Sequence, residues 1–194
     1  FGCGYDHAII RETRTSILSG REDTVVFAAG VSPADVTYSR PAGTNDLVIT
    51  LSDGSTLTIE KCFEILFGLG QYEFNRVEQF RFADHPDATR TLESIQLELL
   101  AGTAGDDRLE GFELKAVLDG GAGNDLLIGR NGDDTYIFGR GYGNDVIEDF
   151  ETNILASQKG DLVRFGADIL PSDLTFPRSA NDIIIGISGT SDTL

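Results

Sequence analysis

The chain has 194 residues, which is enough for one or two small domains with buried cores. It carries 32 acidic and 15 basic side chains, a formal net charge of −17, which argues against nucleic acid or anionic lipid as a partner. No apolar run approaches the roughly 18 residues that a membrane span requires.

Short apolar runs separated by turn signals predict a small all-β domain over residues 23–100. The expected strands begin at Thr24, Val36, Leu47, Thr56 and Val77. Asp53-Gly54-Ser55, between two alternating runs, is typical of a hairpin turn. Cys3 and Cys62 can form one disulfide or remain free, and the sequence leaves both alternatives open.

A single short helix is predicted at residues 89–100, at the end of this domain. Thr91 can cap its first turn, and Leu92, Ile95 and Leu99 fall on one face. Because a glycine-rich repeat follows at once, we expect this helix to cap the open end of the repeat.

A nine-residue repeat occupies residues 101–150. Its copies are GTAGDDRLE from Gly102, the worn GFELKAVLD, GGAGNDLLI, GRNGDDTYI and, after a two-residue slip, RGYGNDVIE from Arg140. Glycines set tight turns, an aspartate ends most turns, and position eight is always apolar, as in Leu127 and Tyr136. The repeat predicts two parallel sheets of very short strands, with each turn stacked on the turn two copies later.

Such stacked turns bring carboxylates and backbone carbonyls together in each gap. These oxygen ligands favour Ca²⁺ over zinc or copper. Without an ion, Asp107 and Asp125 would face each other unpaired, so binding and folding should be coupled.

A longer repeat relates the two ends of the chain. The sequence from Phe1 resembles that from Phe138, an offset of 138 − 1 = 137 residues. We therefore interpret residues 1–22 as the end of a degenerate preceding unit and residues 151–194 as the truncated start of a second β domain. Asp6 and Ala8 stand where Gly143 and Asp145 stand later, so no ion is expected near the N-terminus.

The nonapeptides closely resemble the RTX, or haemolysin-type, calcium-binding repeat GGxGxDxUx. The resemblance implies a right-handed parallel β-roll in which carbonyls and aspartates of alternate turns hold Ca²⁺. Carried over by position, one site would use Thr103, Gly105 and Asp107 with Gly120, Ala122 and Asp125. A second would use Gly121, Gly123 and Asp125 with Arg140, Tyr142 and Asp145.

The opposite side of the roll is expected to bind less well. There Asp134, with Gly129 and Asn131, would face Ala116 of the worn copy, which predicts a distorted or empty site. Below it, Gly132 and Asp134 could bind an ion together with an acidic residue of Glu148-Asp149.

Residues 23–83 are similar to a domain that often accompanies such repeats, the haemolysin-type calcium-binding-related domain. The motifs that carry this resemblance are GVSPADVTYSR, NDLVITLSDGSTLTIEKCF and VEQFRFAD. His85-Pro86-Asp87 departs from the pattern in one loop, where a glycine is expected after Asp84.

The leading hypothesis is a calcium-binding structural module of a secreted, multi-repeat RTX-type protein that folds outside the cell. By resemblance, such proteins leave bacteria by type I secretion and include toxins and adhesins. The expected partners are calcium ions and neighbouring repeat units.

The alternative is an adhesion or polysaccharide-binding module, with Tyr5, Tyr72, Phe74 and Tyr142 stacking on sugars. We expect no enzymatic activity in these residues, because no GxSxG or HExxH motif occurs.

Overall fold

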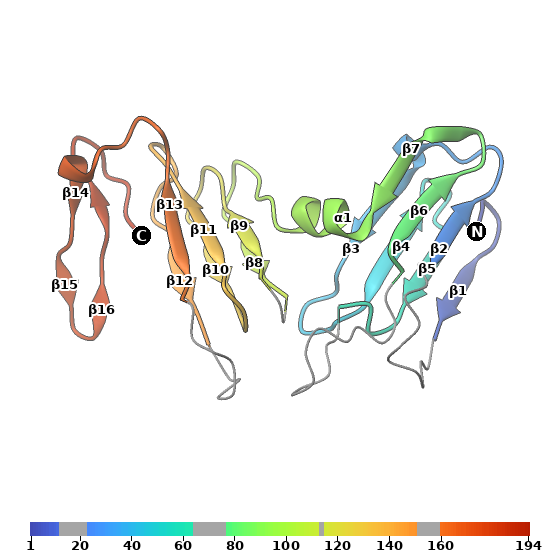
Figure 1. The fold of residues 1–194 in the computed structure, drawn as a ribbon, viewed down its shortest axis with the longest axis horizontal. Coiled ribbons are helices and arrows are strands. Elements are labelled where there is room, and N and C mark those ends of the chain that lie inside the picture. Colours follow the sequence, from blue (N-terminus) through green and yellow to red (C-terminus); the bar gives the residue numbers. More distant parts are fainter. Residues whose placement is uncertain (12–22, 64–76, 113–114, 151–159) are drawn as a thin grey trace. The chain divides into compact units, whose positions relative to one another are not determined.

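The computed structural model describes residues 1–11, 23–63, 77–112, 115–150 and 160–194. The chain divides into two compact units, Phe1–Leu99 and Leu100–Leu194 (Figure 1). Tyr72, Phe74 and Leu114 lie outside the described residues. Within the described residues, no helix is both long and apolar enough to cross a membrane.

The described residues of the first unit form two sheets. One has the strand order β1-β5-β4-β3, with β1 parallel to β5 and the other pairs antiparallel; the second has the order β2-β6-β7. The strands are β1 (His7–Ile10), β2 (Thr24–Phe27), β3 (Val36–Ser39), β4 (Leu47–Leu51), β5 (Thr56–Ile59), β6 (Gln79–Phe82) and β7 (His85–Thr91), with a 3₁₀ turn at Pro33–Asp35. Apolar residues alternate along β4 and β5, and their buried side chains form the core with Phe27, Phe80 and Ile95.

The helix α1 spans Leu92–Leu99, so its predicted start at residue 89 was wrong. His85–Thr91, expected as a loop and the first helical turn, forms strand β7 against β6. Cross-strand pairing outweighs helix formation here. Thr91 caps the helix as predicted, because its Oγ1 accepts the Ser94 N–H at 3.2 Å. That the helix caps the roll stays a prediction.

The second unit contains the roll as predicted. Strands from alternate copies form two parallel three-stranded sheets, ordered β12-β10-β8 and β13-β11-β9. Their bounds are β8 (Arg108–Glu110), β9 (Val117–Asp119), β10 (Leu126–Ile128), β11 (Thr135–Phe138), β12 (Val146–Glu148) and β13 (Leu162–Phe165). Position eight fills the space between the sheets: Leu118 and Leu127 are fully buried and Tyr136 is nearly so. The fold class is therefore all-β, with a parallel roll.

The two-residue slip has a structural cause. Strand β11 is four residues long, one more than β10, and its extra residue is the fully buried Phe138. Phe138 packs with Ile169 and Ile187 from the end of the chain. The inserted residues therefore give the roll a side chain that anchors the elements following it.

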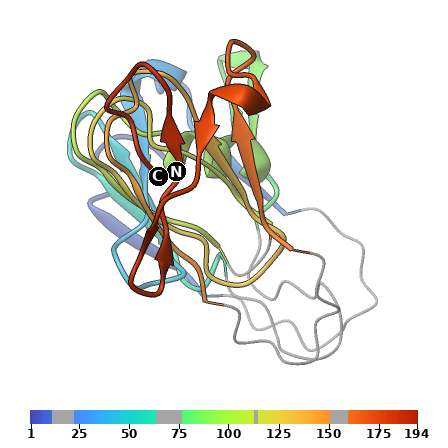
Figure 2. The same ribbon diagram turned by 90° about the vertical axis from the view of Figure 1, so that its left-hand side faces the viewer.

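Those elements repeat the first unit in part. A hairpin has its base in β14 (Leu174–Thr175) and β17 (Gly186–Ile187), and its tip in β15 (Arg178–Ser179) and β16 (Asp182–Ile183), after a 3₁₀ turn at Pro171–Asp173 (Figure 1, Figure 2). This order corresponds to the 3₁₀ turn, β3 and β4 of the first unit. Strand β13, which the sequence assigned to the flanking domain, pairs with β11 and so extends the roll.

Candidate metal centre

Three turns stack on one side of the roll, ending at Asp107, Asp125 and Asp145. The Asp107 N–H donates to Asp125 Oδ1 at 2.9 Å, and the Asp125 N–H donates to Asp145 Oδ1 at 3.0 Å. Each buried carboxylate thus binds the turn before it with one oxygen. This hydrogen bond fixes the orientation of the carboxylate, so Oδ2 of Asp125 and of Asp145 remains available to another ligand.

The second oxygens are buried without a hydrogen-bond donor. Asp125 and Asp145 are 2% and 4% exposed, and Oδ2 of each has no hydrogen-bond partner. Burial raises the pKa of both carboxyls, that of Asp145 to about 6. A buried carboxylate oxygen without a partner is costly, and a bound cation removes that cost. The two residues therefore fit a metal ion.

Backbone carbonyls provide the other oxygen atoms in these gaps. A Cβ added at Gly121 would lie 2.5 Å from the Thr103 carbonyl oxygen, and one at Gly143 would lie 2.0 Å from that of Gly123. Successive turns are therefore so close that only glycine fits between them. Neutral carbonyls beside buried carboxylates form the oxygen-rich, flexible environment that suits Ca²⁺.

The structure brings the predicted ligand residues of the first site together. Thr103, Gly105 and Asp107 lie on the turn adjacent to Gly120, Ala122 and Asp125. In contrast to Asp125 and Asp145, Asp107 uses its Oδ2 to stabilise its own turn. This oxygen accepts hydrogen bonds from the Thr103 N–H at 2.6 Å and from the Thr103 hydroxyl at 2.8 Å.

The second predicted set is also assembled, despite the slip. Gly121, Gly123 and Asp125 lie against the turn from Arg140 to Asp145, in the register set by Leu126 and Val146. The Tyr142 carbonyl oxygen, a predicted ligand, accepts the Gly123 N–H at 2.9 Å. The Arg140 side chain bonds to residues that follow the roll instead. Coordination by either set stays a prediction.

We expect Gly102→Ala to destabilise the roll by about 1–3 kcal/mol or more, because its Cβ would lie 1.9 Å from the Gly120 carbonyl oxygen. Gly105→Ala is the matched control in the same turn, since its nearest neighbour is the Thr103 hydroxyl at 3.8 Å. Calcium-saturated thermal unfolding compares the two. Equal melting temperatures would contradict the close stacking.

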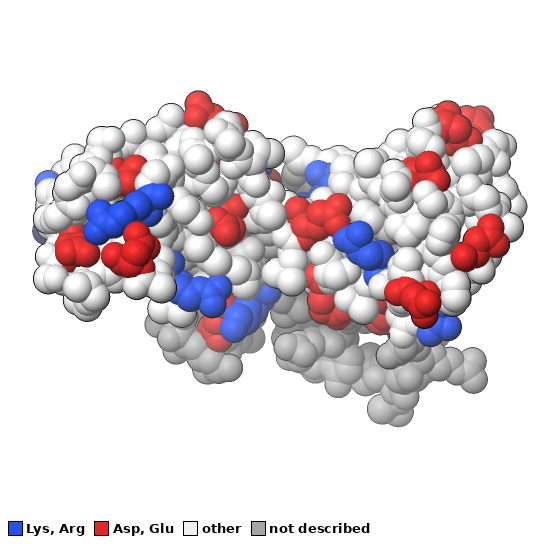
Figure 3. Space-filling view, turned by 90° about the horizontal axis from the view of Figure 1, so that it is seen from above, with Lys and Arg blue, Asp and Glu red and all other residues white. Residues whose placement is uncertain are grey.

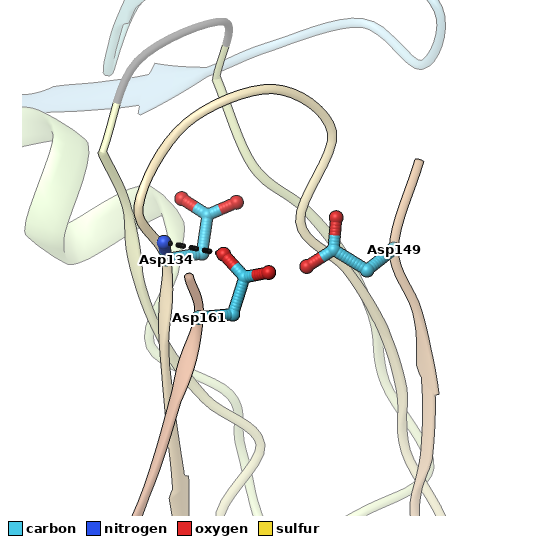
Figure 4. Close-up of side chains that lie close together, drawn as sticks. All are labelled: Asp134, Asp149 and Asp161. Carbon is cyan, nitrogen blue, oxygen red and sulfur yellow. Dashed lines mark hydrogen bonds between the residues drawn. The ribbon is translucent and has the colours of Figure 1, made fainter. Parts of the chain in front are cut away.

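On the opposite side of the roll, three carboxylates converge (Figure 4). One oxygen each of Asp134, Asp149 and Asp161 lie within 4.8 Å of one another. The Asp134 N–H donates to Asp161 Oδ1 at 2.9 Å, and the Tyr136 hydroxyl donates to Asp149 Oδ2 at 2.7 Å. The predicted pair of Asp134 and an acid at 148–149 is therefore brought together, and Gly132 lies in the same turn with a φ of +127°.

Sequence reasoning missed Asp161 and Tyr136. The sequence before Asp161 does not keep the glycine spacing of the repeat, but Val163 follows Asp161 two places later, as position eight follows position six. That spacing was the available signal. Tyr136 was read only as a position-eight core residue.

The gap above Asp134 faces the worn copy, and a distorted or empty site there stays a prediction. Ala116 stands in the place of the turn-ending aspartate, and its N–H donates to Asp134 Oδ1 at 2.7 Å. At position two, Arg130 replaces glycine with a φ of +73°, and its guanidinium pairs with Glu110. Phe112 is buried in the same worn turn region. An apolar side chain and an ion pair thus occupy this part of the roll.

Calcium affinity is expected to fall steeply as the pH drops below about 6. Without metal, burial raises the pKa of Asp145 to about 6. Protonation of Asp145 therefore stabilises the metal-free fold at low pH, and this stabilisation is lost as the pH rises through about 6. Calcium binds the carboxylate form, so protons compete with it. Calcium titrations at pH 7.5 and 5.0 measure this; an Asp145→Asn variant should show a smaller pH effect. Equal affinities at both pH values would contradict it.

Cys3 is exposed and Cys62 is buried, and no disulfide joins them. The open alternative of a disulfide between them is therefore resolved in favour of two thiols.

Comparison with known proteins agrees with the geometry of the roll. The family model described as the RTX calcium-binding nonapeptide repeat matches residues 98–113 and 116–147, with four copies. No curated protein matches the chain. Among solved structures, the extracellular lipase LipA from Serratia marcescens is similar at 15% identity with a TM-score of 0.26, covering 97% of this chain.

The chain spans 31% of the length of that lipase, and a TM-score this low carries no argument about function. The family match carries the assignment, because it falls on the stacked turns and their buried carboxylates. Residues 98–113 and 116–147 of this chain are therefore RTX calcium-binding nonapeptide repeats, and their cofactor is Ca²⁺.

Proposed function

We propose that two calcium ions bind in the two gaps between the turns that end at Asp107, Asp125 and Asp145. The supporting observation is the pair of buried oxygens, Asp125 Oδ2 and Asp145 Oδ2, which have no hydrogen-bond partner. Asp125 lies between both gaps and would contribute to both sites. Thr103, Gly105, Gly120 and Ala122 would complete the first site through carbonyls, and Gly121, Gly123, Arg140 and Tyr142 the second.

A third ion is proposed at the carboxylates of Asp134, Asp149 and Asp161. Two features support it: the repeat register, which makes Asp134 the counterpart of Asp125, and the convergence of the three side chains (Figure 4). The Tyr136 hydroxyl holds Asp149 in place. This site differs from the other two because three carboxylates converge there.

Calcium is proposed to drive folding of the roll after export from the cell. On the face shown in Figure 3, basic side chains lie beside acidic ones, while other acidic groups stand apart from them. The net charge of −17 disfavours the compact state until cations bind. Extracellular calcium modules often require about 10⁻⁴–10⁻³ M calcium, far above cytosolic levels. A secreted or surface protein, exported by type I secretion, fits this behaviour.

We propose a structural role rather than catalysis or sugar binding. Tyr142 packs edge-on against Phe138, with ring centroids 5.7 Å apart, and is half-buried. Tyr5 is exposed, but it packs against Phe1 in the same edge-on manner. The described aromatic residues of the alternative hypothesis are thus engaged in packing. The carboxylates of the roll are engaged by backbone amides.

The test is a titration of the β signal in circular dichroism with calcium, with magnesium at equal concentration as the control. We expect the signal to rise between roughly 10⁻⁴ and 10⁻³ M calcium and to remain low with magnesium. A spectrum that is unaffected by chelator would refute calcium-driven folding. Native mass spectrometry then counts the bound ions.

A further inference from the structure

The end of the roll meets a turn from the last residues of the chain. Thr193 forms a parallel bridge with Asn144. The Thr193 N–H donates to the Gly143 carbonyl at 2.9 Å, and the Asp145 N–H donates to the Thr193 carbonyl at 2.9 Å. Residues 189–193, here called the closing turn, therefore occupy the position where another nonapeptide turn would stack.

Asp192 of the closing turn differs from the aspartates within the roll. It is 6% exposed, and its two oxygens accept the N–H groups of Gly141 at 2.8 Å and Gly143 at 3.1 Å. Both glycines have positive φ, so their amides point towards the same anion. These hydrogen bonds also hold the pKa of Asp192 below its usual range. The carboxylate thus engages the turn with both oxygens, whereas Asp145 keeps one without a donor.

A second contact ties the same turn to the flanking elements. The Arg140 guanidinium donates to the Ser188 carbonyl and to Asp173, both at 3.1 Å, and lies 3.4 Å from Asp168. Arg140 begins the last turn of the roll, and its partners belong to the 3₁₀ turn and hairpin that follow. The junction between the roll and the closing turn is therefore held by hydrogen bonds to the backbone of the last turn and by the charged contacts of Arg140.

The first unit contains the same junction without a calcium-type turn. Gly4, the counterpart of Gly141, donates its N–H to Asp53 at 2.7 Å and to the Ser55 hydroxyl at 3.2 Å. The Thr56 N–H donates to the Asp6 carbonyl at 2.8 Å, and β1 pairs parallel with β5. Ala8 stands here in place of the turn-ending aspartate, so this junction forms on a turn that lacks the metal-binding carboxylate.

We propose that the hairpin turn of each flanking β module recognises the last turn of the preceding roll through its backbone amides, and so closes the stack without a metal ion. Among the described residues, no following nonapeptide turn engages the amides of the last turn. A carboxylate or hydroxyl from the hairpin engages them, and the strand beside it continues the parallel pairing. The partner of each module is thus the end of a roll, whether or not that roll binds calcium.

The test is amide hydrogen exchange in the full chain with saturating calcium. Asp192→Ala should speed the exchange of Gly141 and Gly143 by roughly 10–100-fold, because hydrogen bonds to a charged acceptor are lost. Asp192→Asn, which keeps one acceptor oxygen, should have an intermediate effect. Asp182→Ala, which removes an exposed carboxylate from β16 in the hairpin that precedes the closing turn, is the matched control. Equal protection of Gly141 and Gly143 in the Asp192→Ala and Asp182→Ala variants overturns the proposal.

The first unit supplies an independent arm, which remains decisive if Asp192→Ala fails to fold. An Asp53→Ala/Ser55→Ala variant should speed the exchange of Gly4, and chelator should leave Gly4 protected in the unmodified chain. Protection of Gly4 that disappears on chelation overturns closure without metal. The proposal rests on the proposed function, but the two can fail separately. If the protein bound no calcium, the calcium sites would be refuted, whereas the exchange of the Gly4 amide would still test the junction.

Discussion

Chelation of calcium is expected to unfold the roll while the first unit stays folded. The roll has stacked carboxylates at Asp125 and Asp145 whose second oxygens need a cation, and its strands β8, β10 and β12 are only three residues long. The first unit instead buries Phe27, Phe80 and other large apolar side chains between its sheets and helix. Its stability therefore comes from apolar burial, which chelation does not change.

Hydrogen exchange before and after addition of EGTA measures this difference by residue. Amides of β10 and β11 should lose protection, whereas those of β4 and β5 should keep it. EGTA that has been presaturated with calcium is the control for the chelator itself. Loss of protection in both units at the same calcium concentration would show that they fold as one, and would contradict this prediction.

Replacing Asp125 is expected to damage two calcium sites at once. At 100-fold excess calcium, each independent site adds about 2.7 kcal/mol to stability, so Asp125→Asn should remove roughly twice that amount. Asp107→Asn and Asp145→Asn should each weaken one site. The reason is the position of Asp125, whose N–H and carboxylate contact the turns on either side.

Calcium-dependent shifts in chemical unfolding, together with the number of bound ions, provide the measurement. Asp106→Asn is the matched control, because Asp106 is an exposed neighbour whose side chain accepts hydrogen bonds from Asn124 at 2.8 and 3.1 Å. An amide oxygen can accept the same bonds. If Asp125→Asn loses no more calcium-dependent stability than Asp145→Asn, Asp125 does not serve both sites.

Much of the roll could be predicted because its information is local and periodic. Glycines at fixed positions, a turn-ending aspartate and an apolar position eight each specify one feature of a turn, and repetition fixes the stacking. The two-sheet arrangement and the buried Leu118 and Leu127 follow from that pattern.

The other elements depend on contacts between distant residues. The start of α1 was placed too early because the pairing of β7 with β6 is not visible in the local pattern around Thr89. The two-residue slip is visible in the sequence, but its role is not: it places Phe138 in a core with Ile169 and Ile187. Asp161 was missed because the residues before it do not keep the glycine spacing of the repeat, and because it lies 27 residues from Asp134.

The sequence by itself determined the repeat, its turn chemistry and its choice of a calcium-type oxygen site, because each nonapeptide encodes its own turn. Only the tertiary structure decided which oxygens are already used. The Asp107 carboxylate accepts hydrogen bonds from its own turn, and the Asp192 carboxylate accepts them from the last turn of the roll. Asp125 and Asp145 each have one buried oxygen without a hydrogen-bond donor. Identical side chains thus have different roles, because the donors to Asp107 come from its own turn, whereas those to Asp125, Asp145 and Asp192 come from neighbouring turns.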